Sequence, residues 1–209
     1  RTERLNPTRD TFFPSVMFKI GRFGRNDADL MFQDVIEGNI IQMADRVMDA
    51  LQAKYLVSPI RFEGMQRYEK LEIPKEALRE VLYNAIAHKD YTGSDIQMHV
   101  YDDRLEIESP GKLPNIVTVD NIKETRYSRN PRIARLLTDF GWVRELNEGV
   151  KRIYSDMEKF FLDDPIYSEP EQSVRLVLKN NIVMRNLRKK DRAIDSIGED
   201  IWTTLDDNS

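Results

Sequence analysis

The chain of 209 residues contains no cysteine and only two histidines. The lack of cysteine excludes disulfide bonds, thiolate zinc sites and thiol catalysis, and it is typical of proteins in a reducing compartment. Two histidines cannot build a metal centre with several imidazole ligands, but a Mg²⁺ site made of oxygen ligands stays open. No apolar run approaches the length of a membrane span, and no stretch has the composition of a signal peptide. We therefore expect a cytoplasmic protein with no membrane partner.

A strong positive charge is also missing. The net charge is −4 and the isoelectric point is about 5.4, so the chain as a whole is not built to bind a polyanion. The phosphate-binding pattern G-x-x-x-x-G-K-[ST] is absent. Residues 185–192, RNLRKKDR, are a local exception that resembles a linker. Direct DNA contact through this basic run is an alternative, and it predicts a steep loss of affinity with salt.

The stretch PKEALREVLYNAIAHKDY, residues 74–91, predicts the helix around which the chain is organised. Its apolar residues recur with helical spacing. Glu80, Asn84 and His88 lie one turn apart on the opposite side. A solvated helix face is the ordinary interpretation of such a stripe. Two features weaken it here, because Asn is a poor residue for a helix interior and because the helix runs directly into a cluster, from His88 to Tyr91, that is able to bind anions or metals.

Alternating or helically spaced apolar residues predict the other elements. The expected strands lie at 16–20, 30–36, 96–100, 105–107 and 174–178, with weak strands at 56–62, 65–73 and 182–184. The expected helices lie at 39–54, 131–140 and 149–161, with Asn39 and Asn130 as N-caps. In the hairpin after residue 95, a two-residue turn sets His99 opposite Glu106. We therefore interpret His99 as a surface partner of Glu106 and not as a ligand.

These elements predict an α/β (α+β) two-layer sandwich with a mixed, mostly antiparallel sheet. The helices at 75–88, 131–140 and 149–161 should cover one face, and the first strands with the helix at 39–54 should form an N-terminal appendage. We divide the chain into an N-terminal strand and helix segment (1–70), the main domain (71–184), and a basic linker with the start of a further domain (185–209). Arg1 is not a natural first residue, so we expect a fragment of a longer protein.

Three motifs resemble those of the GHKL ATPases. Glu80-Val-Leu-Tyr-Asn84 is similar to their E-x-x-x-N box, Ser109-Pro-Gly111 falls where the D-x-G adenine box stands, and Asn147-Glu-Gly149 falls where a second glycine box opens a helix. In order and spacing, residues 10–180 more closely resemble the divergent GHKL-like C-terminal region of bacterial transcriptional regulators of the RecG-like, "ATP-dependent DNA helicase-related" type. The characteristic stretches are LREVLYNAIAHKDY, YDDRLEIESPGKLP, SRNPRIARLL and ELNEGVKRIY.

The resemblance implies a Bergerat-type fold that binds ATP with Mg²⁺. It implies Asn84 as the metal ligand, Glu80 as the general base, Ser109 and Gly111 near adenine, and Gly149 near phosphate. The further candidates for cofactor binding are His88, Lys89, Arg129 and Asn130.

The resemblance also implies partners. Such regulators carry a Schlafen-like N-terminal domain and a C-terminal winged helix, so DNA would be bound by domains outside this chain. Residues 197–202 look like the first helix of that winged domain. The apolar stripe at 194–205 needs a following domain or a homodimer partner to cover it.

Departures from the family pattern leave a second reading open. Ser109 is short and uncharged where the family has its adenine-reading Asp, and of the glycine boxes only Gly111 and Gly149 remain. The chain then is either an ATP-binding domain, with slow hydrolysis left open, or a degenerate scaffold or dimerisation module that binds no nucleotide.

Overall fold

The computed structural model describes residues 15–24, 26–56, 61–63, 66–68, 73–125, 127–142, 148–180 and 184–192. Only the backbone is described within 61–68. The strands are β1 Ser15–Phe23, β2 Leu30–Asn39, β3 Arg61–Glu63, β4 Gln66–Tyr68, β5 Ile96–Val100, β6 Arg104–Pro110, β7 Ile166–Ser168 and β8 Ser173–Lys179. The helices are α1 Ile40–Ala50, which continues as a π-helical turn over Leu51–Tyr55, α2 Lys75–His88, α3 Pro131–Asp139 and α4 Gly149–Lys159. A further, unlabelled helix spans 184–192.

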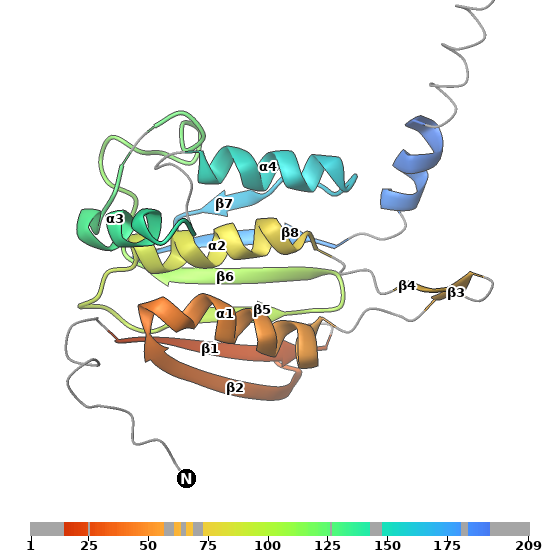
Figure 1. The fold of residues 1–209 in the computed structure, drawn as a ribbon, viewed down its shortest axis with the longest axis horizontal. Coiled ribbons are helices and arrows are strands. Elements are labelled where there is room, and N and C mark those ends of the chain that lie inside the picture. The colour runs from red at the N-terminus through yellow and green to blue at the C-terminus, as the bar shows by residue number, and fades with distance from the viewer. Residues whose placement is uncertain are drawn as a thin grey trace, which may run out of the picture.

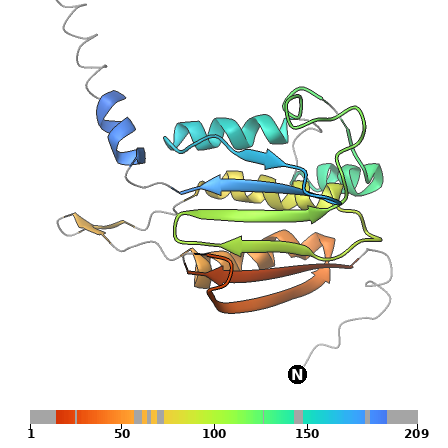
Figure 2. The ribbon, with the colours of Figure 1, turned by 180° about the vertical axis from the view of Figure 1, so that it is seen from behind.

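Six strands form one sheet in the order β2-β1-β5-β6-β8-β7. All neighbours are antiparallel except β1 and β5, which are parallel. The four labelled helices lie against one face of this sheet (Figure 1), and the view from behind shows the other face without them (Figure 2). The predicted fold class, an α/β sandwich with a mixed sheet covered on one face, is confirmed.

The two layers follow from the sequence pattern. Every second residue of β5 is buried, and so are Leu105 and Ile107 of β6, because one side of each strand packs against the helices. The predicted hairpin register is also confirmed, with Val100 opposite Leu105 and His99 opposite Glu106. The apolar stripe of α2 is buried in the core, and its members are Leu78, Val81, Leu82, Ala85 and Ile86.

The predicted N-terminal appendage needs correction. β1 pairs with β5 along Phe18 to Arg22, so the first two strands extend the main sheet, and α1 packs over them. The six-stranded sheet combines strands from before and after residue 70. The division of the chain into units stays a prediction. A parallel pairing between strands so far apart in sequence leaves no local pattern to read.

Smaller differences concern boundaries. Pro74 is the N-cap of α2 and not its first helical residue, and α4 ends at Lys159. The region 56–73 contributes a separate two-strand pair, β3 and β4. β8 pairs with β6 on one side and, on the other, with the short strand β7, which the sequence did not predict. Residues 181–183, and the winged-helix segment at 197–202, lie outside the described residues.

Candidate functional site

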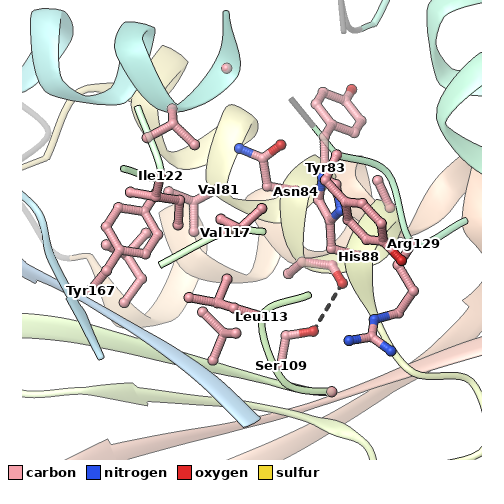
Figure 3. Close-up of a pocket in the computed structure, with 18 of the residues that line it drawn as sticks. Val81, Tyr83, Asn84, His88, Ser109, Leu113, Val117, Ile122, Arg129 and Tyr167 are labelled. Carbon is pink, nitrogen blue, oxygen red and sulfur yellow. Dashed lines mark hydrogen bonds between the residues drawn. The ribbon is translucent and has the colours of Figure 1, made fainter. Parts of the chain in front are cut away.

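A cavity of about 170 Å³ lies between α2, the end of β6 and the start of α4. The loop after β6, together with residues of α3, β7 and β8, forms its remaining walls (Figure 3). Seven of the residues singled out in the sequence line it: Glu80, Asn84, His88, Ser109, Gly111, Arg129 and Gly149. The helical period of α2 and the glycine-containing segments therefore converge on one cavity.

Glu80 is the carboxyl group that lines this site, and it is buried. Only 5% of the residue is exposed, and its Oε1 atom has no hydrogen-bond partner. Burial raises the pKa of this carboxyl above its ordinary value; Arg152, whose guanidinium lies 3.8 Å from Oε2, lowers the pKa, and Asp156 raises it further. A buried carboxylate without a close partner is poised to exchange a proton or to accept a hydrogen bond from a ligand.

Asn84 lies one helical turn after Glu80, and its Nδ2 atom is also buried without a partner. The first residue of α4, Gly149, packs directly on both side chains. A Cβ atom at position 149 would lie 2.0 Å from Oε1 of Glu80 and 3.2 Å from Nδ2 of Asn84. Glycine is therefore the residue type that lets the N-terminus of α4, with its free N–H groups, approach the two polar side chains.

Ser109 and Gly111 lie at the end of β6. The Ser109 hydroxyl donates to the carbonyl oxygen of Ala85 at 3.1 Å (dashed in Figure 3), so its lone pairs stay available to a ligand while its proton is used. Gly111 has a φ of 109°, a conformation that residues with a side chain rarely adopt. It turns the chain from the sheet into the loop that closes the cavity.

His88 and Arg129 lie on the same side of the cavity as Ser109 (Figure 3). Burial, with a smaller effect from Arg129, lowers the pKa of His88 to about 4, so the imidazole is neutral at pH 7. The Arg129 guanidinium donates to the carbonyl oxygen of Lys112. Arg129 is therefore the cation of this group that can meet an anion.

Two predicted candidates do not reach the cavity. The ammonium of Lys89 donates to the carbonyl oxygen of Asp90 at 2.9 Å and lies over the ring of Tyr91. Asn130 stands at the N-cap position of α3, but its side chain makes no capping bond. Its amide donates instead to the carbonyl oxygens of Ala87 and Lys89 at 3.0 and 2.7 Å, which ties α3 to the end of α2.

The sequence did not single out the apolar walls of the cavity. These are Val81, Ala85, Ile107, Leu113, Val117, Ile122, Ala134, Leu137, Val150, Tyr167, Val174 and Leu176. Those on strands and helices belong to ordinary core stripes, and those in the loop from 113 to 122 follow no period. Outside the cavity, Lys123 of the same loop lies 3.6 Å from the ring centre of Tyr154 in α4, and Tyr154 stacks on Tyr167.

The groups that line the cavity are chemically suited to a nucleotide with Mg²⁺. The apolar walls suit a planar base, and Asn84 offers an amide oxygen at the end where Glu80 and Gly149 meet. Within the described residues, no three His, Asp or Glu side chains gather around a possible metal position. A Mg²⁺ ion here would therefore need ligand phosphates and waters besides Asn84, as is common for this ion. The volume lies below the ~300–1,000 Å³ of typical ligand pockets, so the cavity encloses only part of a nucleotide.

The basic run forms the helix 184–192 and packs on the end of α4. Arg188 pairs with Asp163 at 2.5 Å, and Arg185 is buried beside the Phe160 ring. Lys189 and Arg192 lie over the ring of Phe161. Direct contact of this run with DNA stays a prediction.

The fold and the cavity define a class: an α/β two-layer sandwich with a cavity between its central helix α2 and the end of strand β6. Residues 93–178 match the family model described as "Putative ATP-dependent DNA helicase recG C-terminal". This match supports the predicted resemblance of the region to the divergent RecG-like, ATPase-like C-terminal regions. Glu80 and Asn84 lie before the matched residues.

Thirty chains of solved structures are similar to this one. Among them is the DIP2311 protein from Corynebacterium diphtheriae, with 25% identity over 80% of this chain and a TM-score of 0.72. The chain spans about a third of the length of that structure, because the match covers 35% of it. No curated protein matches the chain. Within the described residues, no helix is both long and apolar enough to cross a membrane.

Proposed function

We propose that this chain is a GHKL-like ATP-binding domain of a cytoplasmic bacterial transcriptional regulator. One observation supports the proposal above the others. Glu80 and Asn84, one turn apart on α2, have buried polar atoms without partners, and both meet the start of α4 at the wall of a cavity. Burying a polar atom without a hydrogen-bond partner costs free energy, so two such atoms at one site favour a role in ligand binding.

In this proposal Asn84 holds Mg²⁺ against the phosphates, and the N–H groups at the start of α4 face the same phosphates. The base lies among the apolar walls toward Ser109, whose lone pairs accept one hydrogen bond from it. Glu80, with its raised pKa, orients or deprotonates a water if the nucleotide is hydrolysed. DNA is bound by domains outside this chain. The ATP-binding domain signals to them whether a nucleotide is bound.

A second candidate is a scaffold or dimerisation module that has lost nucleotide binding. The small cavity favours it, and so does the Ser109 hydroxyl, whose proton is already donated to Ala85. The two candidates differ in one measurable property, which is the affinity for Mg-ATP.

Isothermal titration of the chain with Mg-ATP separates them. We expect saturable heat for the parent protein, and its loss in Asn84→Ala. Glu76→Gln, an exposed change on the same helix, is the matched control and should bind like the parent. No heat for the parent at millimolar nucleotide would establish the scaffold reading.

A further inference from the structure

β2 is the one long edge of the six-stranded sheet. At the other edge, β7 has only three residues, whereas β2 has ten. In the part of the chain that the structure describes, no strand pairs with the outer side of β2 (Figures 1 and 2). A long unpaired edge offers a row of backbone donors and acceptors to another strand.

The side chains of β2 do not protect this edge. Met31 is 62% exposed, Val35 is 58% exposed and Leu30 is 46% exposed. The strand, LMFQDVIEGN, contains no Lys, Arg or Pro, which are the residues that commonly prevent edge pairing. Of its two acids, Asp34 is already engaged by Lys54 at 2.7 Å and by the Tyr55 hydroxyl at 2.7 Å, and Glu37 lies near the far end of the strand. The segment from Leu30 to Ile36 is therefore an apolar edge whose one charge is paired, and such an edge is suited to association.

One end of β2 is covered. The Arg46 guanidinium reaches from α1 over Gly38 and donates to the carbonyl oxygen of Glu37 at 2.5 Å. The edge that stays free therefore runs from Leu30 to Ile36. Exposed and less exposed residues alternate from Met31 to Ile36, so Met31, Gln33 and Val35 share the open face of the sheet.

We propose that this edge pairs antiparallel with the β2 edge of a second copy of the chain, with the two-fold axis at Gln33. In this register Met31 of each copy lies opposite Val35 of the other, and Leu30 lies opposite Ile36. Each of the three exposed apolar residues then has an apolar residue of the other copy opposite it. The two Gln33 amides meet at the axis and can bond each other.

Charge and sterics select this register over its neighbours. With the axis at Gln33, Asp34 lies opposite Phe32, and no like charges face each other between Leu30 and Ile36. With the axis at Asp34, two carboxylates would lie directly opposite, which is unfavourable. With the axis at Val35, Gly38 and the Arg46 side chain that covers it would lie inside the paired segment. Of the three alignments compared, the one with the axis at Gln33 is therefore the most favourable.

The absence of cysteine allows a direct test, because one introduced thiol is unique in the chain. Residues directly opposite in antiparallel strands have Cα atoms about 4.5–5.5 Å apart, a distance that a disulfide can bridge. Gln33→Cys should form a disulfide-linked dimer under mild oxidation. Gln97→Cys, on the same face but inside the sheet on β5, is the matched control and should stay monomeric. Linking of Gln33→Cys no faster than Gln97→Cys would overturn the proposal.

The same cross-linking experiment determines which residues of the two β2 strands lie opposite each other. Val35→Cys alone should not link, because its opposite residue is Met31. The pair Met31→Cys and Val35→Cys in one chain should link efficiently. Linking through Val35→Cys alone would overturn the axis at Gln33.

Sedimentation equilibrium measures the association itself. The parent should show a dimer that grows with concentration, and Val35→Lys should be monomeric because its charge would face Met31. Ile166→Lys, at a similarly exposed apolar residue of the opposite edge, is the control and should dimerise like the parent. A parent that stays monomeric up to hundreds of micromolar, or a Val35→Lys variant that dimerises equally, overturns the proposal. β2 contributes no residue to the cavity, so these outcomes are independent of nucleotide binding.

Discussion

At the scale of single residues, burying the carboxyl group of Glu80 is the main free-energy cost of the cavity. A carboxyl group that is almost completely buried loses its hydration, and Arg152 at 3.8 Å offsets this loss only in part. Proteins retain such groups at sites of binding or catalysis more often than elsewhere. The energetic cost of Glu80 can be measured without any ligand.

Glu80→Gln should change the dependence of stability on pH. Burial raises the folded-state pKa above the ordinary value of 4.5, so the native chain binds more protons than the unfolded chain between these two values. The stability of the parent therefore falls as pH rises through that window, and the loss persists at neutral pH. The Gln variant lacks this ionisation and should be more stable than the parent at pH 7, with the difference vanishing at acid pH.

Urea denaturation at a series of pH values checks this expectation. Glu76→Gln is the control, because Glu76 is exposed on the same helix and should show no such difference. Parallel pH profiles for the parent and Glu80→Gln would contradict a raised pKa.

Gly149 gives a second prediction at this scale. In Gly149→Ala the new methyl group would lie 2.0 Å from Oε1 of Glu80, so that side chain must move. We expect a destabilisation of about 1–3 kcal/mol, the usual cost of overpacking. In a Glu80→Ala background the space is free, and the same substitution should cost little.

A double-mutant cycle of these two positions, measured by urea denaturation, isolates the clash. Equal costs of Gly149→Ala in both backgrounds would show that the close approach to Glu80 is not the cause.

At the scale of elements, the sequence predicted what local periodicity encodes. The helical spacing in α2 placed Glu80 and Asn84 on one face, and the alternation in the β5–β6 hairpin set its register. The sequence could not show that β1 pairs with β5, because no local pattern links strands that lie so far apart in the chain. The three residues of β7 are too few for a pattern, and the apolar loop that closes the cavity has no period.

Asn130 shows the same limit for a single side chain. Its position before a proline and an apolar stripe is typical of an N-cap, and it does occupy that position. The side chain nevertheless turns to α2, because the carbonyl oxygens of Ala87 and Lys89 at the end of that helix lack helical partners. The direction of a side chain depends on tertiary contacts that a sequence pattern does not contain.

Asn130→Ala should therefore loosen the junction of α2 and α3. Two hydrogen bonds are lost, and each contributes about 0.5–1.5 kcal/mol, so we expect a loss of about 1–3 kcal/mol in the free energy of unfolding. Asn130→Asp should not restore it, since a carboxylate cannot donate to either carbonyl. Chemical denaturation measures both, with the exposed Asn115→Ala as control. A loss no greater than that of the control would rule out the junction as a stabilising contact.

At the scale of the whole molecule, elements far apart in the sequence bound the cavity. α2, β6, α3, α4, β7, β8 and the connecting loop each contribute to its walls. A ligand held there contacts parts of the chain that unfolding would separate. Binding is therefore coupled to global stability through ordinary mass action.

The last prediction uses this coupling. If the proposed function is right, Mg-ATP at a hundred times its dissociation constant should stabilise the parent by about 2.7 kcal/mol and raise its melting temperature. Asn84→Ala, which lacks the proposed metal ligand, should melt at the same temperature with and without nucleotide. Differential scanning fluorimetry over a range of Mg-ATP concentrations measures both proteins. An equal shift in the two proteins would point to binding outside the cavity. No shift in the parent would leave the fold as a scaffold, because a ligand that binds the native state in preference to the unfolded state must stabilise it.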